Sequence, residues 1–590
     1  MARAETKRLI AQARQALMRG AADYALILLG DAHEAAPKDA GAACLFADAL
    51  LEAAQPMTAI EVLAAHLAAS PRSAEAARRL SDIFAAVTPV SFATVSAAGL
   101  AAALRLDRVA ADPLGRAAGL LLAERGERAA FAPGTDEAAL LLALLDAAPV
   151  RQPALEGWLV ARRRAALDGL SGPAAPQDEA LLAAMARQVW LNEAVWPAGE
   201  AERAAVGRLD LADPAARGVA ALYLSPDAWC PPADGAPGID MPRSLVGLAA
   251  DINRERHAMA RAEAALGPAA GVSDPTGAAV AAQYEANPYP RWGWVQAPPG
   301  GRKGSGAGPG AGPGAGRRRL ARIAGRAAAP ADDWTKGPLR IVVAGCGTGQ
   351  EAVQAALAYA PDARLLAFDF SRASLRYAAM KARQHGLKAI RFRQADILDL
   401  PHFEPPFDRP ADLIECIGVL HHMADPFAGW RILLDRLRPG GLMYVGLYSA
   451  TARRGLTALR EKLAGAGIDP ADPDAIRAVR ARILARPEDH FERALAESAD
   501  FYTLSEVRDL LFHAHETPLT LEAIGEFLEG EGLDFRHMDV RPHIAEAFAE
   551  SPDGGPGDAA ARDLRAWAAF ERDNPDTFDG MYLFWVRKPG

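Results

Sequence analysis

Small and apolar residues recur at a fixed interval over the first ninety residues of the chain. A shift of 34 positions places Ala25 on Ala59, Leu29 on Leu63 and Pro37 on Pro71. Small alanines let paired helices approach closely, and a proline cannot continue the helix that it follows. The pattern therefore predicts pairs of packed helices over residues 1–90.

This period resembles the tetratricopeptide repeat, whose unit of 34 residues is a pair of helices. The alternative is an alanine-rich helical bundle with an accidental period, because many alanines make chance matches easy. Two repeats are fewer than such a stack needs, so neighbouring helices are expected to cap them. The resemblance implies that this part of the chain recruits a protein substrate or partner.

Residues 91–268 continue at helical spacing without a clear repeat. The apolar stripes are typical of amphipathic helices that pack in a core, and they include Leu140, Leu141, Leu144, Leu145, Leu181, Leu182, Met185 and Val189. We predict a helical domain here and assign it no chemistry.

A connector follows over residues 269–296 and contains the segment YEANPYPRWGW, which begins at Tyr284. Its prolines, Pro288 and Pro290, predict an extended segment or a tight turn. Residues 297–332 are rich in glycine and alanine and cannot build a core, so we predict a flexible insertion. Seven basic residues lie in this insertion, and a solvated loop explains them better than a phosphate contact.

Strands and helices alternate from about residue 333 to 590. The run LRIVVAGCGTGQEAVQAAL reads as a strand, a turn containing Gly345, Gly347 and Gly349, and a helix. Glycines at such a turn let a cofactor approach the backbone closely. A second strand ends at Asp369, where an acid can accept hydrogen bonds from both ribose hydroxyls. A third strand leads to Asp396, which is placed for an adenine amino group.

A fourth strand, a helix over 426–437 and a fifth strand complete the predicted parallel sheet. The segments near Phe535–Val540 and Met581–Arg587 would add an antiparallel strand pair. A helical insertion at about 451–524 separates the fifth strand from this pair. The predicted fold is thus multidomain, with an all-α helical repeat region followed by an α/β Rossmann-like domain.

These elements resemble the class I S-adenosylmethionine-dependent methyltransferases, whose sheet has seven strands with an antiparallel last strand. The resemblance implies methyl transfer with S-adenosyl-L-methionine as cofactor. It implies cofactor contacts from Gly345, Cys346, Gly347, Gly349, Asp369, Phe370, Asp396, Ile397 and Ile417. A nicotinamide-binding domain would instead have G-x-G-x-x-G, whereas Gln350 occupies the position of the last glycine. The whole layout is similar to bacterial proteins that join such repeats to a methyltransferase through a YExNPYPRW-like segment.

The chain departs from the family pattern at Val343, where many members carry an acid two positions before the first glycine. Other polar groups must then bind the methionine end of the cofactor, and Tyr284, Glu285 and Arg291 are the nearest candidates by sequence. Without a replacement, the domain would be a weakly active or non-catalytic scaffold that binds partners through its repeats. We keep this as the alternative function.

Candidate acid–base groups lie in the connector and after the fourth strand. Histidine titrates near neutrality, so His421 and His422 are candidate catalytic residues together with Tyr284. A packing role for the two histidines is an equal alternative. His513, His515 and Glu516 are too few and too irregular for a metal site, so no metal is expected.

Composition limits the remaining possibilities. The chain of 590 residues has a net charge of −9 and a pI near 5.8, which argues against general nucleic-acid binding. Four scattered cysteines without a CxxC pair indicate reduced thiols. We find no signal peptide and no apolar run long enough to cross a membrane, so we expect a cytoplasmic protein. The sequence does not specify an oligomeric state.

Overall fold

The computed structural model describes residues 2–89, 91–126, 134–170, 178–232, 241–267, 269–272, 274–296, 319–321, 323, 338–359, 363–402, 410–554 and 560–590. Most of the predicted flexible insertion therefore lies outside the described residues. The chain divides into two compact units. The first comprises Met1–Arg254, Trp292–Gln296 and Ala471–Val507, and the second comprises Glu255–Arg291, Ala297–Pro470 and Arg508–Gly590. Among the described residues, no helix has both the length and the apolarity needed to span a bilayer.

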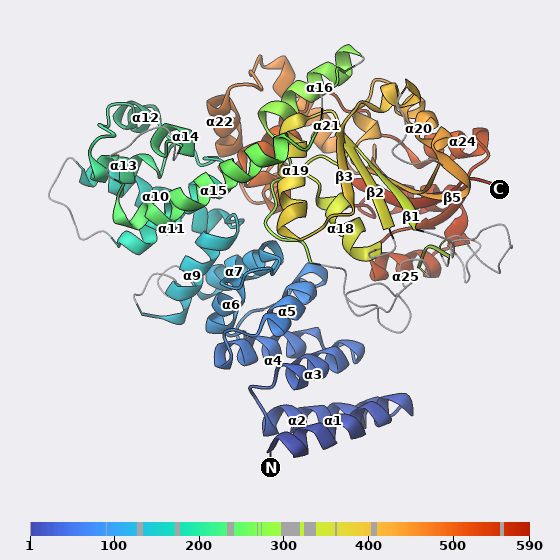
Figure 1. The fold of residues 1–590 in the computed structure, drawn as a ribbon, viewed down its shortest axis with the longest axis horizontal. Helices are drawn as coiled ribbons and strands as arrows, with labels where there is room; N and C mark the ends of the chain where they lie inside the picture. The colour runs from blue at the N-terminus through green and yellow to red at the C-terminus, as the bar shows by residue number, and fades with distance from the viewer. Residues whose placement is uncertain are drawn as a thin grey trace. The chain divides into compact units, whose positions relative to one another are not determined.

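The first unit is helical in its described residues. Its helices are α1 (Ala2–Met18), α2 (Ala22–Ala35), α3 (Ala40–Glu52), α4 (Pro56–Ala69), α5 (Ala74–Ala86), α6 (Ala97–Leu104), α7 (Ala111–Arg125), α9 (Asp136–Ala147), α10 (Pro153–Gly169), α11 (Glu179–Leu191), α12 (Glu200–Val206), α13 (Pro214–Ala220), α14 (Pro226–Trp229), η1 (Arg243–Leu245), α22 (Pro473–Leu484), η4 (Arg493–Glu497) and η5 (Ala499–Phe501). Two more helices, α15 (Val246–Glu263) and α23 (Leu504–Phe512), run from the range of one unit into that of the other. Successive helices from α1 to α5 pack on one another (Figure 1).

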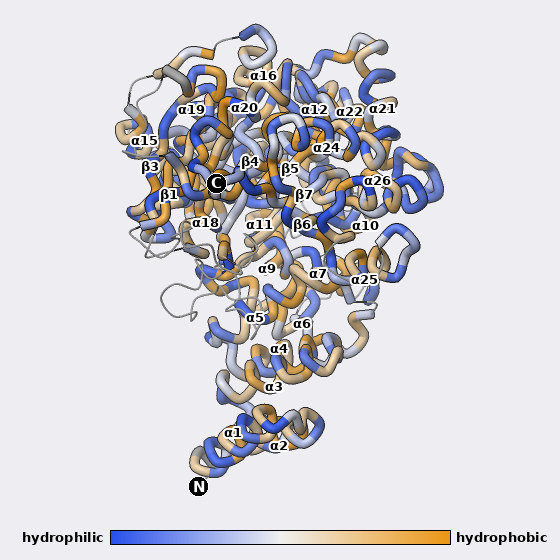
Figure 2. Tube along the Cα trace, turned by 90° about the vertical axis from the view of Figure 1, so that its right-hand side faces the viewer, coloured by the Kyte–Doolittle hydropathy of each residue, from blue (hydrophilic) through white to orange (hydrophobic). Residues whose placement is uncertain are grey.

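The first five helices recur with the period seen in the sequence. The bounds of α2 and α4 differ by 34 positions at both ends, and so do those of α3 and α5. The helices α2 and α4 also end alike, because Ala36 and Ser70 adopt the same ψ of 69° before a proline. Hydrophobic and hydrophilic positions are interspersed along these helices (Figure 2). His66, in the last turn of α4, donates from Nδ1 to the carbonyl of Pro37, which follows α2, at 2.9 Å.

Part of the predicted 451–524 insertion belongs to the first unit. Arg480 on α22 is fully buried and pairs with Glu156 on α10 through two hydrogen bonds of 2.6 and 2.7 Å. Its Nε also donates to the carbonyl of Phe501 at 2.7 Å. Guanidinium and carboxylate groups bind each other in this bidentate way with defined geometry. The segment Ala471–Val507 is therefore held by a buried ion pair, which the sequence did not indicate.

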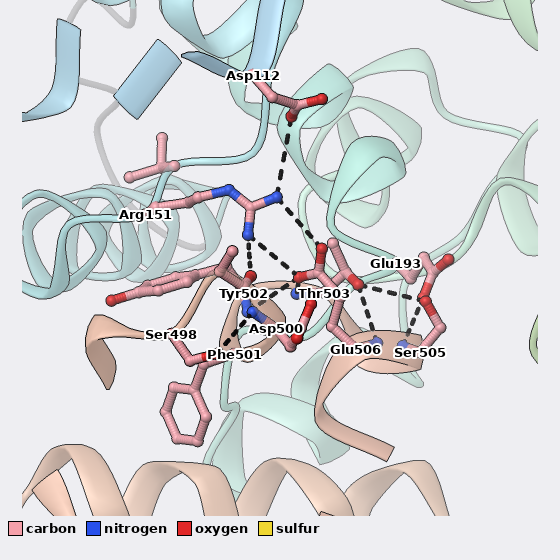
Figure 3. Close-up of polar contacts among 12 residues, drawn as sticks. Asp112, Arg151, Glu193, Ser498, Asp500, Phe501, Tyr502, Thr503, Ser505 and Glu506 are labelled. Carbon is pink, nitrogen blue, oxygen red and sulfur yellow. Dashed lines mark hydrogen bonds and ion pairs between the residues drawn. The ribbon is translucent and has the colours of Figure 1, made fainter. Parts of the chain in front are cut away.

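A second charged cluster holds the end of the same segment. Arg151 donates to Glu506 at 3.2 Å and to the carbonyl of Ala499, and it lies 3.8 Å from Asp112 (Figure 3). Glu193 accepts the backbone N–H of Ser505 at 2.7 Å. Burial raises the pKa of Glu506 to about 7, although the guanidinium of Arg151 opposes that shift. The cluster thus joins ionisable groups from four separate helices and turns around a buried Glu506 and a largely buried Arg151, while Asp112 is 46% exposed.

The second unit contains a seven-stranded sheet with the order β3-β2-β1-β4-β5-β7-β6. Its strands are β1 (Leu339–Ala344), β2 (Ala363–Asp369), β3 (Ile390–Gln394), β4 (Ala411–Ile417), β5 (Leu437–Tyr448), β6 (Asp534–Met538) and β7 (Met581–Arg587). The first five strands are parallel, and β7 runs antiparallel to both β5 and β6. This topology confirms the predicted fold class, including the antiparallel last strand. The strand β1 is buried along nearly its whole length, as a central parallel strand requires.

Helices cover the sheet and build its core. Those of the second unit are α16 (Pro275–Ala286), α18 (Gln350–Tyr359), α19 (Arg372–Gln384), η2 (Ile397–His402), η3 (Leu420–His422), α20 (Pro426–Asp435), α21 (Arg454–Gly465), α24 (Leu521–Gly530), α25 (Pro542–Glu550), η6 (Ala560–Arg562) and α26 (Leu564–Asp573). One face of the sheet packs on α20, α24 and α26, with Trp430 and Trp567 in that core. The helices α18 and α19 pack on β1, β2 and β3. The carboxyl ends of the parallel strands are thereby held in a rigid frame.

The connector differs from its predicted extended conformation at one end. Tyr284 lies in the last turn of α16, which continues to Ala286. The helix stops before Pro288, because a proline disfavours the helical conformation of the residue before it and cannot donate a backbone hydrogen bond. The prediction of an extended segment is therefore wrong for Tyr284–Ala286, and the irregular backbone begins at Asn287.

Candidate active site

A cavity of about 240 Å³ lies at the carboxyl ends of the parallel strands. Its lining includes residues that follow β1, β2 and β3 as well as the ends of β4 and β5. Ten of the twelve residues that the sequence singled out for cofactor binding or catalysis line it: Tyr284, Gly345, Cys346, Gly347, Asp369, Phe370, Asp396, Ile397, Ile417 and His422. The other two, Gly349 and His421, lie elsewhere.

The glycine turn after β1 needs its glycines for two different reasons. Gly345, Gly347 and Gly349 all have positive φ, between 49° and 83°. A Cβ on Gly345 would lie 2.4 Å from the side chain of Val419, and one on Gly349 would lie 2.5 Å from Cβ of Ala378. Gly349 therefore allows α19 to pack against the start of α18 and is placed for packing rather than for cofactor contact.

Asp369, at the end of β2, is fixed by the turn. Its carboxylate accepts the backbone N–H groups of Gly347 and Ser371, each at 2.8 Å. Burial raises the pKa of Asp369 to about 6, while the backbone donors lower it. Asp396 accepts the N–H of Leu398 at 3.0 Å and lines the same cavity. Two acids thus lie at the ends of adjacent strands, as the sequence predicted.

The connector contributes directly to the cavity through Tyr284, Tyr289 and Pro290. The carbonyl of Pro290 accepts a hydrogen bond from Thr348 in the glycine turn. The polar residues Glu285, Asn287 and Arg291 of the connector do not line the cavity. Glu285 accepts hydrogen bonds from Ser371 and from the N–H of Ala373 at the start of α19.

Arg291 and Asn287 also have structural partners. Arg291 pairs with Glu255 and lies 5.6 Å from the ring of Tyr377. Asn287 accepts a hydrogen bond from Arg508. Of the polar groups expected to compensate for Val343, the structure thus brings only Tyr284 to the cavity, and it places Glu285 and Arg291 in supporting contacts.

Tyr284 is part of a buried chain of hydrogen bonds. Its hydroxyl lies 2.8 Å from Oδ1 of Asp509 and 3.1 Å from Nε2 of His513. The N–H of His515 donates to Nδ1 of His513 at 3.1 Å. A neutral imidazole with an acceptor at Nδ1 carries its proton at Nε2. His513 therefore donates to the tyrosine oxygen, and the tyrosine donates to Asp509. Burial and the neighbouring Asp509 raise the pKa of Tyr284 well above its usual value.

The two adjacent histidines have different surroundings. His422 lines the cavity, and its Nδ1 lies 2.9 Å from the carbonyl of His515. His421 is fully buried, stacks on Tyr448 with ring centroids 3.7 Å apart, and accepts the backbone N–H of Tyr448 at 3.2 Å. Burial lowers the pKa of both, to about 4 for His422. The geometry gives His421 a packing position behind the cavity and His422 a position facing it.

His422, His513 and Glu516 bring three potential metal-ligand atoms within 4.8 Å of one another. The carboxylate of Glu516, however, already pairs with Arg453 at 3.2 Å and with Arg460. Two guanidinium groups beside the carboxylate repel a metal cation and leave no net negative charge for it. The arrangement fits a neutral histidine pair beside an ion-pair network of net positive charge better than it fits a metal centre.

The residues of the cavity that sequence reasoning missed include Asp274, Glu351, Tyr448, Asp509 and Met581. Tyr448 ends β5, so the rule that located Asp369 at a strand end could have found it. Asp274 caps α16 by accepting the N–H of Gly277 at 3.0 Å, and an acid before Pro275 signals such a cap. Asp509 lies inside a helix of the insertion, and no local pattern marks it.

The fold and the cavity together define a class I methyltransferase domain. Residues 338–468 match a family described as a methyltransferase domain. The α/β part of the chain therefore contains a region that matches a methyltransferase domain. The matched range ends after β5, so it includes the glycine turn and both acids.

Individual relatives are more distant. An uncharacterized Synechococcus protein is 30% identical over 204 residues, which cover 33% of this chain and 47% of that protein. PKMT2 from Rickettsia typhi, solved with AdoHcy, is 17% identical with a TM-score of 0.33, over 42% of this chain and 49% of that one. The plantazolicin methyltransferase BpumL with SAH is 14% identical with a TM-score of 0.26, over 58% and 100%. The chain thus spans about half the length of the first two.

Proposed function

We propose that this chain transfers a methyl group from S-adenosylmethionine to an acceptor bound in the same cavity. One observation carries the proposal: the glycine turn, Asp369 and Asp396 line a single cavity at the carboxyl ends of β1, β2 and β3. Ligands of open α/β sheets bind at this edge. The cavity also suits a sulfonium cation, because carboxylates line it.

Each cofactor-side residue has a role that its position supports. Asp369 would accept the ribose hydroxyls, and Asp396 with Phe370 and Ile397 would surround the adenine. Gly345, Cys346 and Gly347 would let the methionine part pass close to the backbone, and Ile417 would contact it from β4. S-adenosylmethionine supplies an electrophilic methyl group, so the protein's main task is to hold the acceptor in line with the breaking C–S bond.

Cofactor binding tests this proposal most directly. Asp369→Ala removes the acceptor of two hydroxyl hydrogen bonds, each worth about 1.5–3 kcal/mol when the acceptor is charged. We expect the affinity for S-adenosylhomocysteine, measured by calorimetry, to fall at least about tenfold. Asp399→Ala is the matched control, because Asp399 is a nearby acid that does not line the cavity. Unchanged affinity in Asp369→Ala, or no binding by the parent, would reject the assignment.

The helical unit is proposed to recruit a protein substrate or partner. The recurrence of helix bounds at 34 residues supports a tetratricopeptide-like stack, and such stacks commonly bind peptides. Tyr24 and Ile27 are 57% and 61% exposed on α2 and offer apolar contacts. The double variant Tyr24→Ser, Ile27→Ser should slow methylation of a protein acceptor while leaving the affinity for S-adenosylhomocysteine unchanged. Equal rates for variant and parent would remove this role from α2.

The alternative, a scaffold that binds cofactor without turnover, is favoured by Val343, which is buried where an acid is common. Both functions predict that the chain binds S-adenosylhomocysteine in calorimetry, but only the enzyme is expected to transfer a methyl group. Transfer of a tritiated methyl group from S-adenosylmethionine into any acceptor fraction, abolished in Asp369→Ala, supports the enzyme. Tight binding without transfer supports the scaffold.

A further inference from the structure

One group of residues in the cavity lining presents hydrogen-bond acceptors. Asp509, Tyr284 and His422 line the cavity together with Tyr448. Asp509 and His422 are 4% and 7% exposed. Groups buried to this degree need hydrogen-bond partners, so the chemistry they display limits the ligand.

The direction of each hydrogen bond follows from its fixed partners. A backbone N–H donates to Nδ1 of His513, so His513 donates from Nε2 to the oxygen of Tyr284. The hydroxyl proton of Tyr284 is directed to Asp509. The tyrosine oxygen can then accept one further hydrogen bond, and the Asp509 carboxylate can accept hydrogen bonds only.

The tautomer of His422 is likewise fixed by its hydrogen-bond partner. The carbonyl of His515 can only accept, so Nδ1 of His422 carries the proton and Nε2 keeps its lone pair. Burial lowers the pKa of His422 to about 4, so the ring is neutral at neutral pH. The charged groups around it are Glu516, Arg453 and Arg460, which pair with one another and together carry one net positive charge.

Carboxylates are the only side chains with a full charge among the described residues that line the cavity. Among the described residues that line the cavity are five carboxylates and no lysine or arginine: Asp274, Glu351, Asp369, Asp396 and Asp509. An anionic acceptor such as a carboxylate or phosphate would find no cationic side chain there, and burying it beside these acids would be strongly unfavourable. A hydroxyl would supply one donor only.

We propose that the methyl acceptor is a primary amine, which enters the cavity as an ammonium group and is held by Asp509, the oxygen of Tyr284 and Nε2 of His422. This inference rests on the proposed methyltransferase function. The ammonium group offers three donors and a positive charge to three acceptors, one of them charged. Tyr284 supplies an aromatic ring beside it, whereas the ring of Tyr448 already contacts His421 at 3.7 Å and the guanidinium of Arg453 at 3.6 Å.

The chemical step balances without a further reagent. The ammonium group first loses one proton to bulk solvent, which leaves a neutral amine with a lone pair. The nitrogen attacks the methyl carbon, the N–C bond forms and the C–S bond breaks, and its electrons remain on sulfur. The products are a methylammonium cation and neutral S-adenosylhomocysteine. The three acceptors orient the two remaining N–H bonds so that the lone pair faces the methyl group.

The test uses the full chain loaded with S-adenosylhomocysteine and three small probes of equal length: n-butylamine, n-butanol and butyrate. Binding is measured by calorimetry and by the shift of Tm at constant ionic strength. We expect butylamine to bind and raise Tm, and butyrate to have no effect. Asp509→Asn should weaken butylamine binding about tenfold to a hundredfold and leave the affinity for S-adenosylhomocysteine within about threefold of the parent.

Two controls separate the possible failures. Asp399→Asn should match the parent for every ligand, and Tyr284→Phe should weaken butylamine while keeping S-adenosylhomocysteine. Failure of the parent to bind S-adenosylhomocysteine would reject the methyltransferase function itself. Butyrate or butanol binding as well as butylamine, or no probe binding to the loaded protein, would overturn only the amine acceptor. Loss of S-adenosylhomocysteine affinity in Asp509→Asn would also overturn it, because Asp509 would then serve the methionine ammonium group in place of the acid absent at Val343.

Discussion

Replacing Glu156 with Gln should destabilise the first unit by several kcal/mol. Arg480, its partner, has no exposed side-chain surface, and Glu156 has only 4%. Breaking a buried pair by neutralising one member leaves an uncompensated charge, which typically costs about 3–5 kcal/mol. In this site the carbonyl of Phe501 still accepts from Nε of Arg480, and a glutamine oxygen can accept one further N–H. We therefore expect the lower end of that range, about 3 kcal/mol.

A double-mutant cycle separates the pair from its surroundings. Replacing both residues with leucine removes both charges together, and such replacements are often neutral relative to a buried pair. The double variant should therefore be more stable than either single leucine variant, Glu156→Leu or Arg480→Leu. Glu5→Gln is the control, because Glu5 pairs with Arg8 at a site where the two side chains are 49% and 56% exposed. Exposed pairs contribute little to stability, so this variant should unfold like the parent.

Urea unfolding gives the change in free energy, and hydrogen exchange with mass spectrometry shows where it acts. In Glu156→Gln, peptides from α10 and from Ala471–Val507 should lose protection before those of β1 to β5. A cost below about 1 kcal/mol, or a double variant that costs the sum of the two single variants, would refute the reasoning that this pair holds the segment in the first unit.

Three further outcomes are expected. Gly99→Ala should lower the free energy of unfolding in urea by at least about 1–3 kcal/mol, because the added Cβ would lie 1.9 Å from the carbonyl oxygen of Ala64. Gly157→Ala is the control: the space around the added Cβ is open, so this variant should stabilise α10 by about 0.5–1 kcal/mol. Calorimetry should show the affinity for S-adenosylhomocysteine falling about tenfold per pH unit below a pH of about 6, because burial raises the pKa of Asp369 to about 6 and the protonated form cannot accept both hydroxyls. Because the pKa of Asp369 is higher in the folded state, protonation of Asp369 favours folding at low pH, so unfolding caused by this group would not explain the lost affinity. An affinity that does not change with pH would contradict the role of the carboxylate. A fragment of residues 333–590 should exchange rapidly over Ala471–Val507, since Arg480 and Glu506 would lack Glu156 and Arg151; full protection there would show that the segment folds without them.

The sheet could be predicted because its signals are local. The strands β1, β2 and β4 are short apolar runs that end at an acid or directly before a glycine, and the structure confirms the seven-stranded sheet with its antiparallel last strand. The start of β5 was less predictable. The sequence predicted a helix that extends to residue 437 before the fifth strand, but α20 ends at Asp435 and β5 begins at Leu437. The N–H of Gly440 donates to the carbonyl of Lys588, near the other end of the sequence, and no local pattern reports that contact.

The insertion shows a second limit of local signals. Its helices follow the apolar period, so their existence could be predicted. Their partners could not, because Arg480 on α22 looks in sequence like any arginine of an amphipathic helix. It is buried only because Glu156, 324 positions earlier, meets it. The predicted boundary of a methyltransferase domain with one insertion therefore remains a prediction, while the compact units divide that insertion.

The two sides of the cavity were unequally predictable for the same physical reason. The cofactor side is built from residues that directly follow strands, so the strand pattern alone brings Gly345, Asp369 and Asp396 to one edge. The other side depends on residues more than two hundred positions apart, since Tyr284 reaches Asp509 across 225 positions and His513 across 229. Methyltransferase domains use a common cofactor, and a motif can therefore describe its binding. The acceptor is particular to each protein, so its binding groups come from the connector and the insertion. The chemistry of the methylated substrate therefore has to be inferred from the direction of the hydrogen bonds among these groups. In this cavity those directions leave Asp509, the oxygen of Tyr284 and Nε2 of His422 able to accept hydrogen bonds from a ligand.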